Sequence, residues 1–455
     1  MNEFAKTKGK NAWSWIPTLY FAQGLPYVAV MTIAVIMYKR LGLSNTDIAL
    51  YTSWLYLPWV IKPLWSPFVD LVKTKRLWVI LMQSTIAVGF AGVAFFLPTT
   101  FFIKSTLAFF WLIAFSSATH DIAADGFYML ALTQGEQSFF VGIRNTFYRF
   151  ATIFGQGVLV MLAGLLEEGK IIPKAGGNIP LAWSLSFYLL AAIFLILTLY
   201  HRAILPRPAT DVSRDNITPL GLLKDFFNTF GSFFKKNNLA LALFFILTYR
   251  LGESQLVKIA TPFLLDSAEA GGLGLPTATV GMVYGTIGVI ALLLGGVIGG
   301  IAVSRGGLKK WIIPMALAIN LPDLLYVYMA SALPEKVHVI AFYIGSGSSA
   351  LFLTLDKLYV IIFSVAMEQL GYGFGFTAFM LYLIYVAEGM HKTSHYAIGT
   401  GFMALGMMLP GMAAGAIQEA MGYERFFWFV CLCTLPGILA SVLVKKKLPA
   451  EYGKK

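Results

Sequence analysis

The sequence predicts an all-α membrane protein with twelve transmembrane helices arranged as two six-helix pseudo-repeats, and three observations lead to this fold class. First, 58% of the residues are hydrophobic and 12% are charged, whereas about a quarter of the residues of a soluble chain are charged. Second, twelve apolar runs are each long enough to cross a bilayer. Third, a stretch of the first half of the chain aligns without gaps with a stretch of the second half. Such a chain requires lipid around its outer surface.

The apolar runs match the length of about 20 residues that a helix needs to span the hydrocarbon core. The first six cover approximately residues 15–37, 48–70, 77–98, 105–128, 139–165 and 182–200. The second six cover approximately residues 239–264, 278–303, 311–330, 358–387, 396–419 and 427–444. Segment 337–354 is marginal in length and rich in Gly and Ser, so we expect an outer loop or an interfacial helix there instead of a thirteenth span.

The distribution of basic residues predicts which loops face the cytoplasm, because Lys and Arg are in excess on that side of the membrane. Of the 34 Lys and Arg residues, 21 lie in segments that are inner if the N-terminus is inside, and 8 lie in the outer segments. Both termini are therefore predicted to be cytoplasmic. A thirteenth span would place Lys445, Lys446 and Lys447 outside, against this bias. The net charge of +12 then follows mainly from topology, and we expect no nucleic-acid partner.

Three segments are expected to form the domain organisation. Residues 1–200 form an N-terminal six-helix half, residues 201–238 a cytoplasmic linker, and residues 239–455 a C-terminal six-helix half. Apolar residues recur at helical spacing in the linker: Leu223, Phe226, Phe227, Phe230, Phe233 and Phe234. This pattern predicts an amphipathic helix on the inner leaflet, and a site for a protein partner is the alternative interpretation.

The internal repeat relates two short inner loops. Residues 43–78 align with a segment that starts 234 residues later, which places Asp70 over Ser304. The second copy contains Gly300, Ser304, Arg305, Gly307 and Lys309. This spacing resembles the loop motif of the major facilitator superfamily, with Ser in place of the acid, and the first copy keeps the acid as Asp70. Two similar halves imply a site between them near the bilayer midplane, and alternating access by rocking of one half on the other.

Five basic and four acidic residues of the predicted spans are placed below the lipid headgroups, where each charge costs about 2.5–3.5 kcal/mol at the helix centre. The basic residues are Lys62, Arg144, Arg149, Arg250 and Lys258. The acidic residues are Asp121, Asp125, Glu253 and Glu368. Each is expected to face the interior of the bundle and to have a partner. Ion pairs that only hold helices together are the alternative to a transport role.

The four acids are candidates for proton coupling. Asp121 and Asp125 lie four residues apart on one helix face, and two close carboxylates raise each other's affinity for protons. The alternative is that they hold helices together through Arg144 and Arg149 on the fifth span; we favour it for Asp125 and leave it open for Asp121. Glu253 lies three residues after Arg250, so these two could pair with each other and bind nothing.

Polar residues on the first span lie near the midplane. Tyr20, Gln23 and Pro26 are candidates for substrate contact, and a helix kink at Pro26 is an equally good interpretation.

Motifs of enzymes are not found in the sequence. It contains no Walker loop, no Rossmann unit and no nucleophile elbow, so we expect no enzyme activity and no cofactor. Glu388, His391 and His395 have a spacing found among metal ligands, but they fall at a predicted inner loop, and solvated polar residues are the better interpretation. We therefore expect no metal site.

Seven blocks of sequence together resemble the AmpG muropeptide permease family within the major facilitator superfamily. They lie at residues 23–26, 62–70, 119–127, 249–254, 261–266, 368–379 and 395–415. The resemblance implies a proton symporter of the bacterial inner membrane that acts in peptidoglycan recycling. Its cargo would be N-acetylglucosaminyl-anhydro-N-acetylmuramic acid with or without peptide. A carrier of the same fold for a sugar, an amino-sugar or acetyl-coenzyme A is the alternative.

Cargo of this kind carries carboxylates and sugar rings, which suggests roles for residues within the spans. Lys62, Arg149 and Arg250 could pair with the carboxylates. Tyr20, Trp54 and Tyr249 could stack on sugar faces. Gln23 is an additional candidate for polar contact. The expected partners are thus a small-molecule substrate, protons and membrane lipid.

Overall fold

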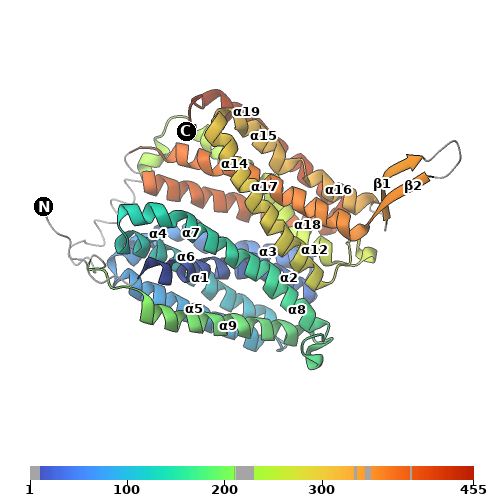
Figure 1. Cartoon of the computed structure of the whole chain (residues 1–455), viewed down its shortest axis with the longest axis horizontal. Coiled ribbons are helices and arrows are strands. Elements are labelled where there is room, and N and C mark those ends of the chain that lie inside the picture. Colours follow the sequence, from blue (N-terminus) through green and yellow to red (C-terminus); the bar gives the residue numbers. More distant parts are fainter. Residues whose placement is uncertain are drawn as a thin grey trace.

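The structure is a computed structural model that describes residues 11–209, 211, 230–332, 336–343, 350–389 and 392–454. Long helices run roughly lengthwise along the molecule in two groups, with α1 to α9 in the lower part of Figure 1 and most of α11 to α19 in the upper part. The last described helix, α19, ends at the same end of the molecule as the start of the described chain (Figure 1). The polypeptide is therefore helical along nearly all of its described length.

The helices before residue 210 build the first group. Their bounds are α1 Ile16–Val28, α2 Ala34–Arg40, α3 Asn45–Trp54, α4 Leu57–Leu71, α5 Lys75–Phe96, α6 Phe102–Ala131, α7 Gln134–Ile153, α8 Val160–Glu167 and α9 Ile179–Ile204. Helices α1 and α2 are joined by a π-helical turn at Ala29–Ile33, which begins three residues after Pro26, so they form one span. A second π-helical turn at Phe154–Leu159 joins α7 and α8.

The helices after residue 238 build the second group. Their bounds are α11 Leu239–Thr248, α12 Leu251–Leu265, α13 Thr277–Val280, α14 Val289–Gly306, α15 Leu308–Asn320, α16 Asp323–Ala332, α17 Lys357–Ala387, α18 Lys392–Cys433 and α19 Leu435–Lys447. A π-helical turn at Gly281–Gly288 joins α13 and α14. Helix α18 is divided at Gly422, which has φ 78° and ψ 168°, a conformation that favours glycine.

The described helices account for the twelve predicted spans. Ten stretches are long and apolar enough to cross a membrane, and one of them, His395–Lys447, has 53 residues and contains the break at Gly422. Because about 20 residues suffice for one crossing, this stretch supplies two spans. Helices α3 and α4, which are separated at Leu55–Tyr56, supply one more. The prediction of a twelve-helix membrane protein is confirmed, and the cytoplasmic location of the termini remains a prediction.

The described parts of segment 337–354 form strands and not a helix. Strands β1 (Lys336–Tyr343) and β2 (Ala350–Asp356) pair in antiparallel register, with Lys336 opposite Asp356. This hairpin projects from one end of the molecule beyond α16 and α17 (Figure 1). The expectation of an interfacial helix is therefore wrong, and the expectation that the segment does not span the membrane agrees with the hairpin.

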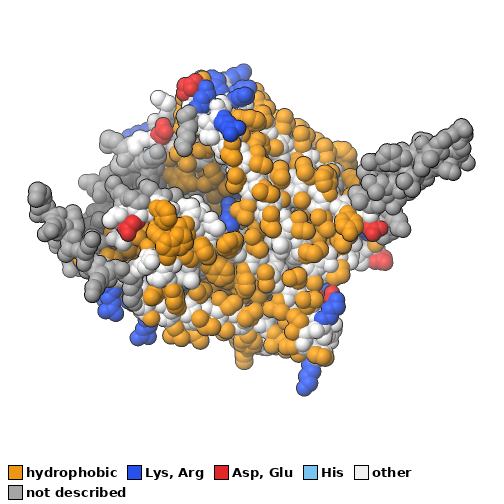
Figure 2. All heavy atoms as spheres, in the orientation of Figure 1, with side chains coloured by type: hydrophobic (Ala, Val, Ile, Leu, Met, Phe, Trp, Pro, Cys, Tyr) orange, Lys and Arg blue, Asp and Glu red, His pale blue; other side chains and the backbone are white. Residues whose placement is uncertain are grey.

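The outer surface between the two ends is apolar. Figure 2 shows hydrophobic side chains over much of the visible face, whereas most of the charged side chains lie near its edges. On α14, Ile290, Leu294, Val297 and Ile301 are all about half exposed and recur at helical spacing. Such a stripe is destabilising in water and is the expected surface of a helix that faces lipid.

The predicted amphipathic helix of the linker lies largely outside the described residues. Of its apolar positions, Phe230, Phe233 and Phe234 are described. Phe233 is fully buried and stacks on Phe402 with a centroid distance of 6.2 Å, whereas Phe234 is 45% exposed. This end of the segment packs against α18.

Candidate functional site

A large cavity lies between the two groups of helices. A pocket of about 940 Å³ is lined by α1, α6 and α7 from the first group and by α14 and α17 from the second. A second pocket of about 520 Å³ is lined by α4, α18 and Arg250 in addition. The pockets share Gln23, Asp125, Tyr148 and Met380, so they adjoin. Figure 2 shows the surface hollowed near the C-terminal end.

The two groups of helices are joined at the opposite end by polar contacts. The Lys39 ammonium lies 2.7 Å from the Asp266 carboxylate, and the Asn45 amide donates to Gln418 at 2.6 Å. Further along this end, Thr277 donates to Glu167 at 2.7 Å. The first pocket, in contrast, reaches Ser304 and Gly453 at the end of the molecule that carries the termini. The cavity is therefore open toward the termini and closed at the other end.

Tight glycine contacts accompany the polar contacts at the closed end. A Cβ atom at Gly415 on α18 would lie 1.9 Å from the Asn45 carbonyl oxygen of α3. A Cβ atom at Gly285 would lie 1.9 Å from the Gln156 carbonyl oxygen. At both places the two groups of helices approach backbone to backbone, which only glycine permits.

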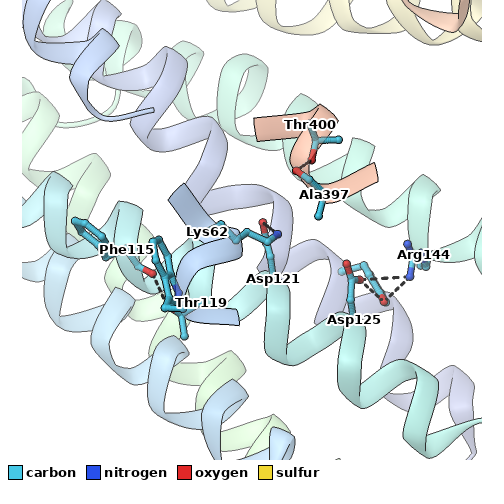
Figure 3. Close-up of polar contacts among 10 residues, drawn as sticks. Lys62, Phe115, Thr119, Asp121, Asp125, Arg144, Ala397 and Thr400 are labelled. Carbon is cyan, nitrogen blue, oxygen red and sulfur yellow. Dashed lines mark hydrogen bonds and ion pairs between the residues drawn. The ribbon is translucent and has the colours of Figure 1, made fainter. Parts of the chain in front are cut away.

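Two ion pairs lie on the first-group side of the cavity (Figure 3). The Lys62 ammonium lies 3.4 Å from the Asp121 carboxylate, and the Arg144 guanidinium lies 3.4 Å from the Asp125 carboxylate. Tyr20 completes the second pair, because its hydroxyl donates to Asp125 at 3.1 Å and accepts from Arg144 at 3.0 Å. Asp125 thus contacts Arg144 of the fifth span, as the ion-pair alternative expects, whereas the partner of Asp121 is Lys62, on α4.

Two further guanidinium groups reach the cavity without a carboxylate partner. Arg149 lines the first pocket and Arg250 lines the second. Within the described ranges, neither forms an ion pair. A cation held in a membrane protein normally faces a counter-charge or a ligand. These two residues therefore leave the cavity with a net positive charge.

Arg250 is positioned by a break in its span and by aromatic rings. Helix α11 ends at Thr248 and α12 begins at Leu251, so Arg250 lies at the break with φ −111°. Its guanidinium donates to the Tyr372 hydroxyl and lies 5.2 Å from the centre of that ring and 5.0 Å from that of Phe376. These cation–π contacts hold a charge in place without neutralising it.

The structure does not bring every predicted substrate contact to the cavity. Gln23 lines both pockets, and its buried Oε1 atom has no hydrogen-bond partner among the described atoms. Trp54 is 43% exposed and lines neither pocket. Tyr249 is buried, and its hydroxyl donates to the Gly375 carbonyl at 2.9 Å. Trp54 and Tyr249 therefore do not contact the cavity in this conformation.

The predicted acids of the second group lie beside the cavity and do not line it. Glu253 and Glu368 are 4% and 2% exposed, and neither lines either pocket. Glu368 accepts a hydrogen bond from Gln369 at 2.9 Å. Arg250 interacts electrostatically with Glu253, but the described residues include no ion pair between them. The alternative that these two form a direct ion pair is therefore not found in this conformation.

The loop-motif residues lie at the open end. Gly300 and Ser304 line the first pocket, and Arg305 is exposed. Gly307 has φ 76° and separates α14 from α15. Asp70 belongs to α4, and its side chain lies outside the described part of the chain.

Several residues of the site were not predicted from the sequence. The cavity is also lined by Tyr27, Tyr56, Trp59, Tyr148, Tyr372 and Phe376. Asp323 is a further buried acid, 1% exposed, within the ninth predicted span. A charged residue inside an apolar run is the signal that could have identified it. Within the described residues no group of His, Cys, Asp and Glu could hold a metal ion, and His391 lies outside them.

Comparisons with known proteins agree with the fold. The sequence model of the Major Facilitator Superfamily matches residues 18–352. The anhydromuropeptide permease of Escherichia coli strain K12 is 25% identical over 446 residues, which cover 95% of this chain and 79% of that protein. A Rickettsia conorii protein named as transporter AmpG 4 is 24% identical over 444 residues, which cover 94% of this chain and 95% of the relative.

Solved structures of transporters have the same arrangement of helices. The nucleoside transporter NupG aligns with a TM-score of 0.66 at 16% identity and covers 96% of this chain and 99% of its own. A D-xylose–proton symporter aligns with a TM-score of 0.66 at 11% identity, with coverage of 97% and 99%. At these identities the likeness concerns the fold alone.

Proposed function

Because the chain belongs to the Major Facilitator Superfamily and is therefore a multi-pass transporter of the inner membrane and not an enzyme, we propose that it imports anhydro-muropeptides driven by the proton gradient. The cargo is N-acetylglucosaminyl-anhydro-N-acetylmuramic acid with or without its peptide. The name of the Escherichia coli relative, an anhydromuropeptide permease, supports this cargo. The residues of the cavity support it independently.

The observation that carries the proposal is the unbalanced positive charge of the cavity. Lys62 and Arg144 are each matched by a carboxylate, and Arg149 and Arg250 are not. A cargo that carries carboxylates supplies the missing charges, and a guanidinium binds a carboxylate through two parallel hydrogen bonds. Aromatic side chains such as Trp59 and Tyr372 offer faces on which sugar rings pack.

We assign proton coupling to the acids that form no ion pair among the described residues. Asp125 is held by Arg144 and Tyr20, and Asp121 is held by Lys62. Glu253 and Glu368 are more deeply buried and form no ion pair among the described residues. A buried carboxylate without a counter-charge is strongly disfavoured, so such a group binds a proton until water reaches it.

Alternating access follows from the two groups of helices. We assign residues 1–200 and 239–455 to two halves that rock on each other, with residues 201–238 as their linker. In the conformation described above the cavity opens at the end of the termini, which is the cytoplasmic end if the predicted topology holds. Import then requires the contacts between Lys39 and Asp266 to break and re-form in each cycle.

Replacing Asp266 by Asn is expected to favour the outward-open state. The carboxylate holds Lys39 across the two halves and accepts from Tyr423 at 2.5 Å, so its loss removes about 1–3 kcal/mol from the closed end and changes the ratio of the states by roughly 5-fold to 160-fold. The readout is the rate at which a membrane-impermeant maleimide modifies N45C in a chain lacking Cys431 and Cys433. The exchanged pair K39D/D266K should restore slow modification. An unchanged rate in D266N would show that the contact between Lys39 and Asp266 does not hold this end closed.

The cargo is tested by uptake into vesicles that contain the purified protein. The labelled muropeptide should accumulate inside when a proton gradient is directed inward, and it should equilibrate without accumulation when no gradient is present. If folded protein takes up no muropeptide, the proposal for this cargo is wrong. Competition with free sugars, amino-sugars and acetyl-coenzyme A then identifies the class of cargo that the same cavity accepts.

A further inference from the structure

Three buried acids come together from three helices of the second group. Glu253 lies on α12, Asp323 begins α16, and Glu368 lies on α17. Their exposed fractions are 4%, 1% and 2%. They come from positions 253, 323 and 368, which are far apart in the sequence, so packing of the helices and not local spacing brings them together. We call these three residues the acid cluster.

The members of the acid cluster lie within electrostatic range of one another. Each of the three pairs interacts electrostatically, namely Glu253 with Asp323, Glu253 with Glu368, and Asp323 with Glu368. The Oδ2 atom of Asp323 lies 3.5 Å from where a Cβ atom at Gly252 would be, directly beside Glu253. The Tyr326 ring, one turn after Asp323 on α16, also interacts with all three acids.

Polar atoms in the acid cluster lack partners. Both carboxylate oxygens of Asp323 are buried and have no hydrogen-bond partner among the described atoms. A buried polar atom without a partner costs about 1–3 kcal/mol, and a buried carboxylate costs more. An arrangement that persists with such orphaned atoms is expected where a ligand completes it.

The charges around the acid cluster do not balance. The groups that interact with it are Arg250 at the break before α12, Tyr284 on the π-helical turn before α14, Tyr326 on α16, Gln369 and Tyr372 on α17, and Cys431 on α18. Of these, Arg250 supplies the one positive charge found within the described residues. Three ionised carboxylates would leave two negative charges in a buried site, which is untenable without a bound cation.

A proton fits this site better than a metal ion. No group of three His, Cys, Asp or Glu side chains in the described part of the chain has a geometry that could hold a metal. Sodium and similar hard cations need about six oxygen ligands that converge on one point. Protons need no such convergence, because each binds one carboxyl group.

We propose that Glu253, Asp323 and Glu368 form one proton site that holds two exchangeable protons, with Arg250 as its counter-charge. The inference rests on the proposed function, because it assigns the protons that drive uptake. Arg250 reaches both the acid cluster and the cavity, so a cargo carboxylate on Arg250 consumes the counter-charge of Glu253 and favours its protonation. By linkage, protons on the acid cluster strengthen the binding of cargo to the same degree.

The test compares the number of protons moved per cargo molecule in the native protein and in D323N. The native protein should move two protons per cargo molecule, and D323N, which mimics a permanently protonated Asp323, should move one. Loss of one moved charge lowers the limiting accumulation about 50-fold at 100 mV. Exchange of cargo across the membrane without a gradient should be retained in D323N. The matched control is D47N, which removes a carboxylate at the start of α3, outside the acid cluster.

Two further measurements separate the possible failures. The infrared C=O stretch of protonated carboxylic acids should be present at neutral pH in the purified protein and should weaken in D323N and in E368Q. If the band changes in this way but no muropeptide is transported, the proposed cargo is wrong and the acid cluster stands. A band and a proton-to-cargo ratio that are the same in D323N as in the native protein would overturn the inference, as would uptake that requires sodium.

Discussion

The variant R250A is expected to lose at least 30-fold in the initial rate of uptake at low cargo concentration. The Arg250 guanidinium is held at a helix break by Tyr372 and Phe376, without a carboxylate partner among the described residues, so its charge is available to the cargo. Removing one partner of a desolvated charged contact costs about 2 kcal/mol or more, which corresponds to this factor. Uptake of labelled muropeptide into vesicles at low concentration measures the loss.

Two variants separate the role of the charge from that of the fold. R250K keeps the charge but lacks the planar guanidinium that binds a carboxylate through two hydrogen bonds. Its uptake should therefore lie between that of the native protein and that of R250A. The matched control is R425A, because Arg425 is exposed on α18 and lines neither pocket. Thermal unfolding should be measured for all three variants. If R250A is folded and takes up cargo at the native rate, Arg250 does not contact the cargo.

The fold could be predicted from the sequence because the bilayer restricts what each segment can do. A run of about 20 apolar residues has no alternative to a helix in lipid, which is why the spans from 15–37 to 427–444 correspond to helices. The weak point was segment 337–354, which forms a hairpin. Because the segment is short and rich in Gly and Ser, the spacing of its hydrophobic residues does not distinguish a helix from a strand. Pairing of strands also depends on contacts between residues that are distant in the chain.

The candidate site could be predicted only as a set of residues and not as a set of contacts. Embedded charges are recognisable in an apolar run, and Lys62, Arg149 and Arg250 do line the cavity. Which charge meets which depends on the packing of helices: Asp121 pairs with Lys62 from α4, which no local spacing indicates. The fifth span was a candidate source of partners for Asp121 and Asp125 because consecutive spans are usually neighbours in space, and Asp125 does meet Arg144 there.

Depth in a span was also insufficient to tell which aromatic side chains face the cavity. Tyr20 and Tyr249 lie near the middle of their spans, yet Tyr20 lines the cavity and Tyr249 is bonded to the Gly375 carbonyl within the second group. The difference is the rotation of each helix about its axis. That rotation is set by packing against neighbouring helices and, for Tyr249, by the helix break at Arg250. The apolar pattern of the sequence reveals neither of them.

The variants G415A and G285A are expected to abolish most uptake while leaving the protein folded. Each glycine brings the backbones of the two halves together at the closed end, and a Cβ atom would lie 1.9 Å from a carbonyl oxygen, either that of Asn45 or that of Gln156. The added methyl group forces the halves apart and costs about 1–3 kcal/mol in the closed state alone. The outward-open state, in which these surfaces separate, does not carry this cost.

The consequence is a shift between conformations by roughly 5-fold to 160-fold, and not a general loss of stability. We expect G415A and G285A to show slow uptake, a normal thermal unfolding transition, and fast modification of N45C in G285A by the impermeant maleimide. G142A is the control, since a Cβ atom at Gly142 meets no atom within 4 Å. The backbone contact at Gly285 is separate from the one at Gly415. Equal losses of uptake in the two variants would therefore show that the halves move as rigid bodies. Slow uptake without faster modification of N45C would instead mean that the methyl group disturbs packing within one half.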